Sequence, residues 1–231
     1  EPVYGTREPA RYVGGANRQP RDLEQAHVLL GMKGIAFEDE DFHAASMFST
    51  LLGGGMSSRL FQEVREKRGL AYSIYSYLSS YTDGGLFGVY AGTGKDNIGD
   101  LVPLVFGEIG KLADGAGGGE DAEIARARAQ IKAGILMSLE STSSRCEQLA
   151  RQTMIFGHPL PIDEIIASMN QVAEGVKASS VIMEFADKCG ITMPIAREAD
   201  GEEAFEAAVS ELSREDLVDL RAFLADVLRA L

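Results

Sequence analysis

Histidine, cysteine and tryptophan are scarce in this chain of 231 residues, which has three histidines, two cysteines and no tryptophan. No two of the histidines, His27, His43 and His158, lie within one helical turn of each other. Cys146 and Cys189 are far apart and have no histidine beside them. A zinc site needs several imidazole or thiolate ligands at close and regular spacing. The sequence therefore predicts no metal site and no zinc-dependent activity of the chain alone.

Positive charge and long apolar runs are lacking as well. The net charge of −13 and the pI near 4.7 exclude the basic surface that nucleic acids require, and they disfavour binding to an anionic membrane. No apolar run reaches the roughly 18 residues of a transmembrane helix, so none is expected. The two widely spaced cysteines make a poor disulfide framework, which favours a reducing compartment. We therefore expect a cytoplasmic protein.

The hydrophobic pattern predicts one sheet with helices around it. A nearly continuous apolar segment at 25–37 predicts a strand buried on both faces. Two alternating segments, 72–81 and 86–92, flank the turn sequence TDGG and predict a hairpin. Helices are predicted at 41–52, 59–67, 97–113, 120–140, 142–156 and 161–169. Together these elements predict an α+β fold with a mainly antiparallel sheet and helices on one side, followed by a helical tail.

The most informative segment is residues 53–85, GGGMSSRLFQEVREKRGLAYSIYSYLSSYTDGG. A helix that carries Arg65 ends at Gly69, and the next strand begins with Tyr72. This order aims a guanidinium and a phenolic hydroxyl into one cleft. Such a pair can stabilise the negative charge that builds on a peptide carbonyl oxygen when it is attacked.

Simpler interpretations of the same residues stay open at this point. Arg65 sits among other charges, including Arg68, and either arginine can be a solvated surface charge or the functional one. Tyr72 can be a packing residue of its strand, as the neighbouring tyrosines are expected to be. Strict alternation places Tyr72 on the same face as Ile74 and opposite Tyr75.

The segment 53–85 and the order of elements over residues 5–171 closely resemble the C-terminal domain of the M16 zinc peptidases, the pitrilysin and mitochondrial-processing-peptidase family. In that family an Arg and a Tyr at this spacing reach from the C-terminal half to the active site of the other half. The resemblance implies that Arg65 and Tyr72 contact the substrate carbonyl in the transition state. It also implies that Arg68 and Gly69, which lie between Arg65 and Tyr72 in the sequence, belong to the substrate-binding surface.

The family's zinc motif, H-x-x-E-H, is absent from this chain. The resemblance therefore predicts the substrate-handling half of an M16 zinc metallopeptidase, inactive alone, without a cofactor of its own. Its partners would be a peptide substrate and a zinc-bearing M16 N-terminal domain or subunit, where zinc is expected. The alternative is a non-catalytic structural or scaffold subunit of a peptidase-like assembly. The presence of both Arg65 and Tyr72 favours the catalytic partner.

After Gln171 the M16 pattern stops. Residues 172–200 resemble a C-terminal segment of NAD-dependent glycerol-3-phosphate dehydrogenase, through VAEGVK at 172–177 and GITMPI at 190–195. A helical fragment of that dehydrogenase is a weak third prediction, because no strand followed by G-x-G-x-x-G occurs. We therefore divide the chain into an M16-like domain, 1–171, and a helical tail, 172–231, whose origin the sequence does not identify.

The end of the tail carries a leucine stripe at helical spacing, made of Leu217, Leu220, Leu224 and Leu228. Each buried leucine is worth roughly 1.5–3 kcal/mol, so the stripe is expected to be covered. Docking on the chain's own domain is favoured because a tethered segment avoids the entropy of association. The other way to cover the stripe is a second copy of the chain, which would make a homodimer.

Overall fold

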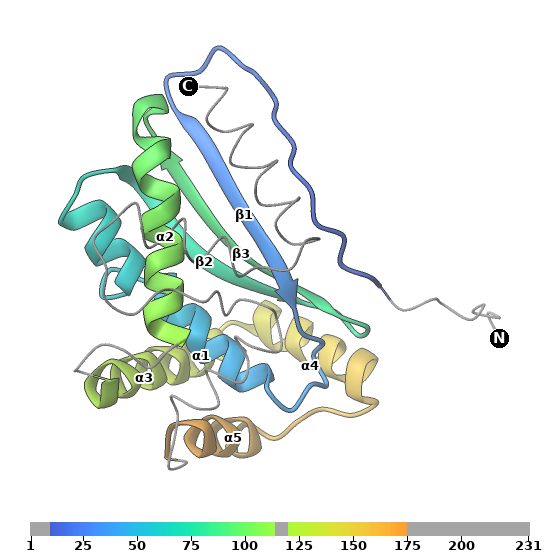
Figure 1. The fold of residues 1–231 in the computed structure, drawn as a ribbon. Helices are drawn as coiled ribbons and strands as arrows, with labels where there is room; N and C mark the ends of the chain where they lie inside the picture. Colours follow the sequence, from blue (N-terminus) through green and yellow to red (C-terminus); the bar gives the residue numbers. More distant parts are fainter. Residues whose placement is uncertain (1–9, 114–119, 175–231) are drawn as a thin grey trace.

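The computed structural model describes residues 10–113 and 120–174 (Figure 1). In chain order the elements are β1 (Ala26–Gly34), α1 (Phe42–Gly53), the π-helix η1 (Phe61–Glu66), β2 (Ala71–Ser80), β3 (Gly85–Thr93), the 3-10 turn η2 (Lys95–Asn97), α2 (Ile98–Ala113), α3 (Glu120–Ser138), α4 (Thr142–Phe156) and α5 (Ile162–Glu174). Every strand and helix predicted between residues 25 and 169 is present. The leucine stripe lies outside the described residues. Within them, no helix combines the length and the apolar character needed to cross a membrane.

The three described strands form one antiparallel sheet in the order β1-β3-β2. β3 is central and pairs with β1 from Ala26↔Thr93 to Gly34↔Gly85. β2 and β3 form the predicted hairpin, closed by a backbone hydrogen bond of 2.8 Å from Tyr81 N–H to the Gly84 oxygen. α1 and α2 pack on one face of this sheet (Figure 1). The α+β architecture with helices on one side is therefore confirmed.

The core lies between the inner face of the sheet and the helices. Phe48 of α1 and Phe87 of β3 are fully buried, and their rings meet edge to face with centroids 5.4 Å apart. Aliphatic side chains of η1, α2 and α3 complete the same cluster. Full burial of such side chains stabilises a fold by roughly 1.5–3 kcal/mol each. This cluster fixes the helices against the sheet.

The triple glycine after α1 allows a close approach of α1 to β2. A Cβ atom on Gly53 would lie 2.3 Å from the backbone nitrogen of Ser76, a distance that real atoms do not reach. At the same contact the Ser76 hydroxyl donates a 2.7 Å hydrogen bond to the Ser49 carbonyl oxygen. Gly53 therefore lets the end of α1 lie directly against the middle of β2.

The outer face of the sheet corrects one prediction. β1 was predicted to be buried on both faces, but Leu29 on its outer face is 63% exposed. His27 is exposed on this face too, and its Nδ1 lies 2.8 Å from the hydroxyl oxygen of Tyr90. Tyr75 stacks on Tyr90 with ring centroids 5.0 Å apart. Histidine and tyrosine can share this half-solvated face because their polar atoms bond to each other. The apolar run of β1 gave no sign in the sequence that one of its faces is exposed.

Candidate functional site

The candidate site begins at η1, a six-residue π-helix. Its widened turn is marked by the Lys67 N–H, which donates to the Gln62 carbonyl oxygen five residues earlier at 3.0 Å. Val64 is fully buried and anchors the helix in the core. Single π-turns are rare and often occur at functional sites because they rotate side chains relative to an α-helix. Here the π-turn sets the direction in which Arg65 leaves the helix.

The connection from η1 to β2 is tightly held. Gly69 has φ +62°, and its N–H donates to the Arg65 carbonyl oxygen at 3.1 Å. This left-handed conformation is costly for residues other than glycine. The carbonyl oxygen of the next residue, Leu70, accepts hydrogen bonds from the Thr93 hydroxyl and, at 3.4 Å, from the Asn97 side-chain amide. The path between Arg65 and the start of β2 is therefore fixed at both ends.

Tyr72 is the extra residue of a β-bulge. Ala71 pairs with Thr93 and Ser73 pairs with Gly92, so Tyr72 has no partner on β3. The bulge also overturns the predicted alternation, because Tyr72 is 72% exposed whereas Ile74, expected on the same face, is buried. Bulges are frequent beside active sites, where they redirect a side chain. This one turns Tyr72 out of the core and towards η1.

The π-turn and the bulge bring Arg65 and Tyr72 together. The Arg65 guanidinium carbon lies 5.5 Å from the centroid of the Tyr72 ring and 4.7 Å from that of Phe61. Its Nε is 4.0 Å from a carboxylate oxygen of Glu66. Cation–π contacts at exposed sites are worth roughly 0.5–1 kcal/mol each, enough to favour one orientation of a long side chain. We call these three side chains, Phe61, Arg65 and Tyr72, the guanidinium stack.

Arg68 and Gly69 hold different positions. Both are exposed, and the positive charge of Arg68 acts on the Glu63 carboxyl. The hydrogen bond from Lys67, assisted by the positive charges of Lys67, Lys111 and Arg68, holds the pKa of the Glu63 carboxyl below its usual value. The N–H of Gly69 is used within the helix end. A substrate contact by either residue stays a prediction.

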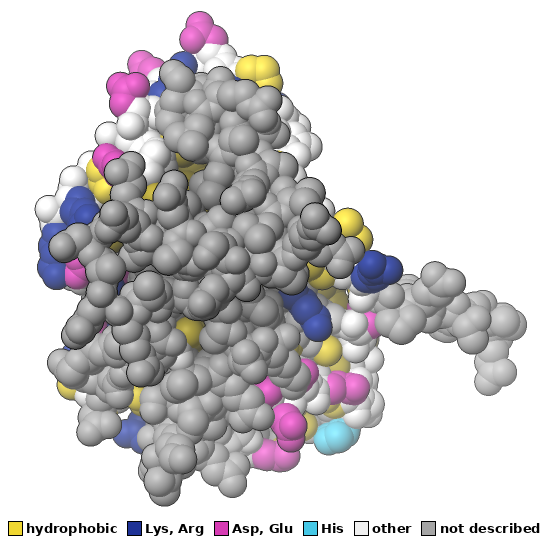
Figure 2. Space-filling model, viewed as in Figure 1, with side chains coloured by type: hydrophobic (Ala, Val, Ile, Leu, Met, Phe, Trp, Pro, Cys, Tyr) yellow, Lys and Arg dark blue, Asp and Glu magenta, His cyan; other side chains and the backbone are white. Residues whose placement is uncertain are grey.

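Basic side chains gather on the side of the molecule that carries η1, at the left of Figure 2. This local positive surface stands out in a chain of net charge −13. A carboxylate or a developing oxyanion would meet favourable charge there. The site is therefore suited to hold the negative charge of a reacting group and has no nucleophile of its own.

Metal ligands do not gather at this site. Across residues 10–113 and 120–174, no group of three or more His, Cys, Asp or Glu side chains is placed to hold an ion. His43 lies at the start of α1, and His158 lies in the turn after α4, where its Nδ1 is 2.9 Å from the carbonyl oxygen of Phe156. Cys146 is an exposed free thiol on α4. The described residues therefore do not fit a zinc ion.

Comparison with known proteins explains this combination. The family model described as Peptidase M16 inactive domain matches residues 1–131. An uncharacterized zinc protease of Streptomyces coelicolor is 42% identical over 166 residues, which cover 72% of this chain and 36% of the relative. The chain belongs to the M16 peptidase family. An uncharacterized zinc protease of Rickettsia felis is 35% identical over 75% of the chain and 41% of its own length. The chain thus spans roughly two fifths of these curated relatives.

Solved structures agree with the fold. The chain is similar to the peptidase M16 inactive domain from Pseudomonas fluorescens, with a TM-score of 0.59 and 26% identity over 71% of this chain and 38% of that one. It is also similar to a conserved protein from Enterococcus faecalis, with a TM-score of 0.64 and 26% identity over 78% of this chain and 41% of that one. The resemblance to the metal-free half of the family is confirmed.

A second family model, described as NAD-dependent glycerol-3-phosphate dehydrogenase C-terminus, matches residues 87–201. This range contains the segment 172–200 on which the second resemblance was based. It also overlaps the M16 match from residue 87 to 131. Most of the segment 172–200 lies outside the described residues. The division of the chain at residue 171 stays a prediction.

Three contributors to the site were missed by sequence reasoning. Phe61 lies in the predicted helix 59–67, but no role was predicted for it. Its ring supports Arg65, four residues later, a spacing that puts two side chains on one helix face. Thr93, at the end of β3, and Asn97, at the start of the predicted helix 97–113, hold the Leu70 carbonyl, and no role in the site was predicted for either. Only the i, i+4 spacing of Phe61 and Arg65 was a usable signal.

Proposed function

We propose that this chain is the substrate-handling half of an M16-type zinc peptidase and that another domain or subunit carries the zinc. The observation that carries the proposal is the guanidinium stack, in which a π-turn and a β-bulge orient Arg65 and Tyr72 toward each other at the surface. The match to an inactive domain and the zinc protease relatives support it. Both side chains are partly exposed, as residues that serve a partner's active site must be.

The proposed chemistry is stabilisation of an oxyanion. When a nucleophile attacks a peptide carbonyl, negative charge builds on the carbonyl oxygen. The Arg65 guanidinium and the Tyr72 hydroxyl would donate hydrogen bonds to that oxygen, and their effect grows as the charge develops. A zinc ion in the partner half would supply Lewis-acid polarisation and an activated water. This chain's own contribution is to hold the two donors in place before the reaction begins.

The geometry favours Arg65 over Arg68 as the functional arginine. Among the cations of the described residues, Arg65 is the one whose guanidinium lies over the Tyr72 ring, at 5.5 Å. Arg68 instead adds to the positive charge that surrounds Glu63. An arginine can act with a tyrosine on one oxygen only if both reach the same point. We therefore assign the transition-state role to Arg65 and a weaker, electrostatic role in substrate attraction to Arg68.

The test is a reconstituted enzyme made from this chain and a zinc-bearing M16 N-terminal half. Arg65→Ala or Tyr72→Phe should each lower kcat by on the order of 100- to 1000-fold, with a smaller effect on KM, because the donors act on charge that exists only in the transition state. Tyr81→Phe is the matched control, since Tyr81 is exposed just past the other end of β2. Turnover within about twofold of wild type for both site variants would contradict the proposal and would indicate a non-catalytic scaffold subunit instead.

A second test uses the chain alone. We expect neither peptidase activity nor stoichiometric zinc in the isolated protein, because the described histidines and cysteine do not cluster. Metal analysis after purification without chelators is the measurement. One tightly held zinc per chain would contradict the proposed division of labour between the two halves.

A further inference from the structure

A cavity of about 520 Å³ lies between the start of α1 and helix α4, away from the guanidinium stack. Pockets that bind small ligands usually measure about 300–1,000 Å³. The Phe37 N–H, at its edge, donates to the Tyr81 carbonyl oxygen at 3.0 Å, just past the end of β2. Tyr72 lies at the other end of this ten-residue strand, roughly 30 Å away at about 3.3 Å per residue. The cavity is therefore a separate place on the molecule.

The floor of the cavity is apolar and preformed. Its apolar lining consists of Phe37, Phe42, Ile155, Phe156, Leu160 and Ile165. The rings of Phe37 and Phe42 pack with centroids 5.3 Å apart. On the opposite wall, the buried Gln152 side chain accepts a 3.1 Å hydrogen bond from the Leu160 N–H and ties the turn after α4 to the helix. Both walls are thus held by contacts of their own, and a ligand need not form them.

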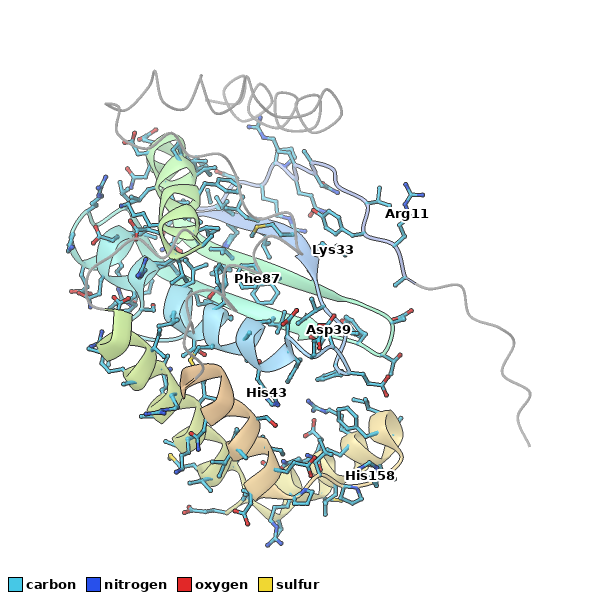
Figure 3. The ribbon with its side chains drawn as sticks, turned by 60° about the horizontal axis from the view of Figure 1, so that its bottom comes forward. Arg11, Lys33, Asp39, His43, Phe87 and His158 are labelled. Carbon is cyan, nitrogen blue, oxygen red and sulfur yellow. The ribbon has the colours of Figure 1, made fainter. Side chains whose placement is uncertain are left out.

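The mouth of the cavity is negative. Glu38, Asp39, Glu147 and Arg151 line it. Glu147 and Arg151 form an ion pair with each other at 2.5 Å, so neither adds net charge to the mouth, and Glu38 contributes a negative charge there. His43 also lines the cavity, pointing from α1 toward α4 and α5 in Figure 3, and burial lowers the pKa of its imidazole, so the ring adds no positive charge at neutral pH. Acidic side chains are visible on this side of the molecule, at the lower right of Figure 2.

We infer that this cavity, the α1–α4 pocket, binds a peptide segment in which an apolar side chain stands beside a lysine or arginine. The apolar side chain would fill the floor, and the cation would meet Glu38 at the mouth. Charge argues against the chain's own residues 175–231 as the occupant, because they carry twelve Asp or Glu and six Lys or Arg. A second copy, with a net charge of −13, is disfavoured for the same reason.

The inference is independent of the proposed function, since binding requires no zinc half and no reaction. If a peptide were also a substrate, the pocket would be a second point of contact far from the Arg65–Tyr72 pair. Two contacts on one chain raise affinity through effective concentration. The pocket can therefore be tested on the isolated chain, and its failure would leave the role of Arg65 and Tyr72 untouched.

The absence of tryptophan from the chain provides a clean readout. An acetylated and amidated peptide with the core Lys-Trp-Lys is the probe, and its indole is then the only one in the sample. We expect a saturable blue shift of the tryptophan emission on titration with the protein. A peptide with the core Glu-Trp-Glu should bind at least about tenfold more weakly, because its charges face those of the mouth. Equal binding of both peptides would overturn the inference.

A matched pair of variants separates the pocket from the general attraction between an acidic protein and a cation. Ile155→Lys places an ammonium group in the lining, whereas Met154→Lys places the same charge one residue away on the exposed side of α4. We expect at least a tenfold loss of affinity for Ile155→Lys and less than a twofold change for Met154→Lys. A similar loss in both variants would contradict a specific pocket.

A second pair removes charge without touching the apolar floor, so that it stays informative even if Ile155→Lys does not fold. Glu38 lines the mouth and the nearby, exposed Glu40 does not. Glu38→Gln should weaken binding of the Lys-Trp-Lys peptide by about threefold, and Glu40→Gln should leave it unchanged. If the two glutamines had the same effect, the cation would not sit at the mouth and the inference would fail.

Discussion

Helices α1 and α4 have similar lengths but opposite relations to the core. Eight residues of α1 are buried, from Ala44 to Gly53, whereas α4 buries only Gln152 among its residues. α1 packs between the sheet and α3. A cavity separates α4 from the start of α1. A helix that buries most of its residues carries stability, and one that buries few is free to serve recognition. The comparison places the stability of the fold in α1 and places the proposed pocket beside α4.

The largest expected effect comes from the contact that holds α1 against β2. Gly53→Val should lower the free energy of unfolding by at least about 4 kcal/mol, because the new side chain would overlap the backbone of Ser76. Urea unfolding followed by circular dichroism measures this. The control is Gly107→Ala in α2, where an added Cβ meets nothing within 4 Å. It should raise stability by about 0.5–1 kcal/mol.

If Gly53→Val were tolerated as well as Gly107→Ala, the close approach of α1 to the sheet would not be required for the fold. The burial of α1 would then no longer explain why α1, and not α4, stabilises the fold. Both substitutions add apolar atoms at a glycine, so a difference between them reports the space available and not the composition.

The same contrast appears when two methionines are shortened. Met47 of α1 is fully buried, and Met154 of α4 is 84% exposed. Met47→Ala should cost about 3 kcal/mol, within the range for buried methionine, because it leaves a cavity. Met154→Ala should change stability by less than about 0.5 kcal/mol. Parallel denaturant curves compare them, and equal losses would show that α4 is part of the cooperative core after all.

The fold was largely predictable because its signals are local. Alternation, helical spacing and the TDGG turn located each strand and helix between residues 25 and 169 to within a few positions. The exposed outer face of β1 was not predictable in the same way, since Leu29 and Val28 are equally apolar and only tertiary packing decides which of them is more buried. Burial depends on which elements cover a strand, and that information is not local.

The sequence named two members of the candidate site, Arg65 and Tyr72, but neither the other contributors nor the geometry was predictable. The spacing of Arg65 and Tyr72 pointed to the family, but a π-turn and a bulge determine how the two side chains meet. Alternation fails at a bulge because one residue has no partner, which shifts every later side chain to the other face. The α1–α4 pocket had no sequence signal, because its lining comes from segments more than a hundred residues apart.

The guanidinium stack provides a smaller effect. Phe61 touches Arg65 and not the reacting oxygen, so we treat it as a positioning residue. In the reconstituted enzyme Phe61→Leu should lower kcat by about threefold, consistent with an exposed cation–π contact of roughly 0.5–1 kcal/mol, with KM nearly unchanged. Phe61→Tyr should restore most of the activity because it keeps the ring. A loss of activity that Phe61→Tyr shared would indicate a packing role instead.

The smallest expected effect is a pH dependence at the boundary between the two helices. Burial lowers the pKa of His43, so the folded protein holds this imidazole neutral below the pH at which the unfolded chain protonates it, near 6.5. The unfolded state then binds more protons, and stability must fall as the pH drops through and below 6.5. Glu38 and Asp39 before α1, and Glu147 and Arg151 on α4, are the charged groups that line the same cavity as His43. His43→Gln should therefore reduce the loss of unfolding free energy between about pH 7.5 and 5.5, on either side of this value, and His158→Gln, in the exposed turn after α4, should not. Urea unfolding at both pH values measures the difference, and an identical slope in wild type and His43→Gln would show that the imidazole is as well solvated as in the unfolded chain.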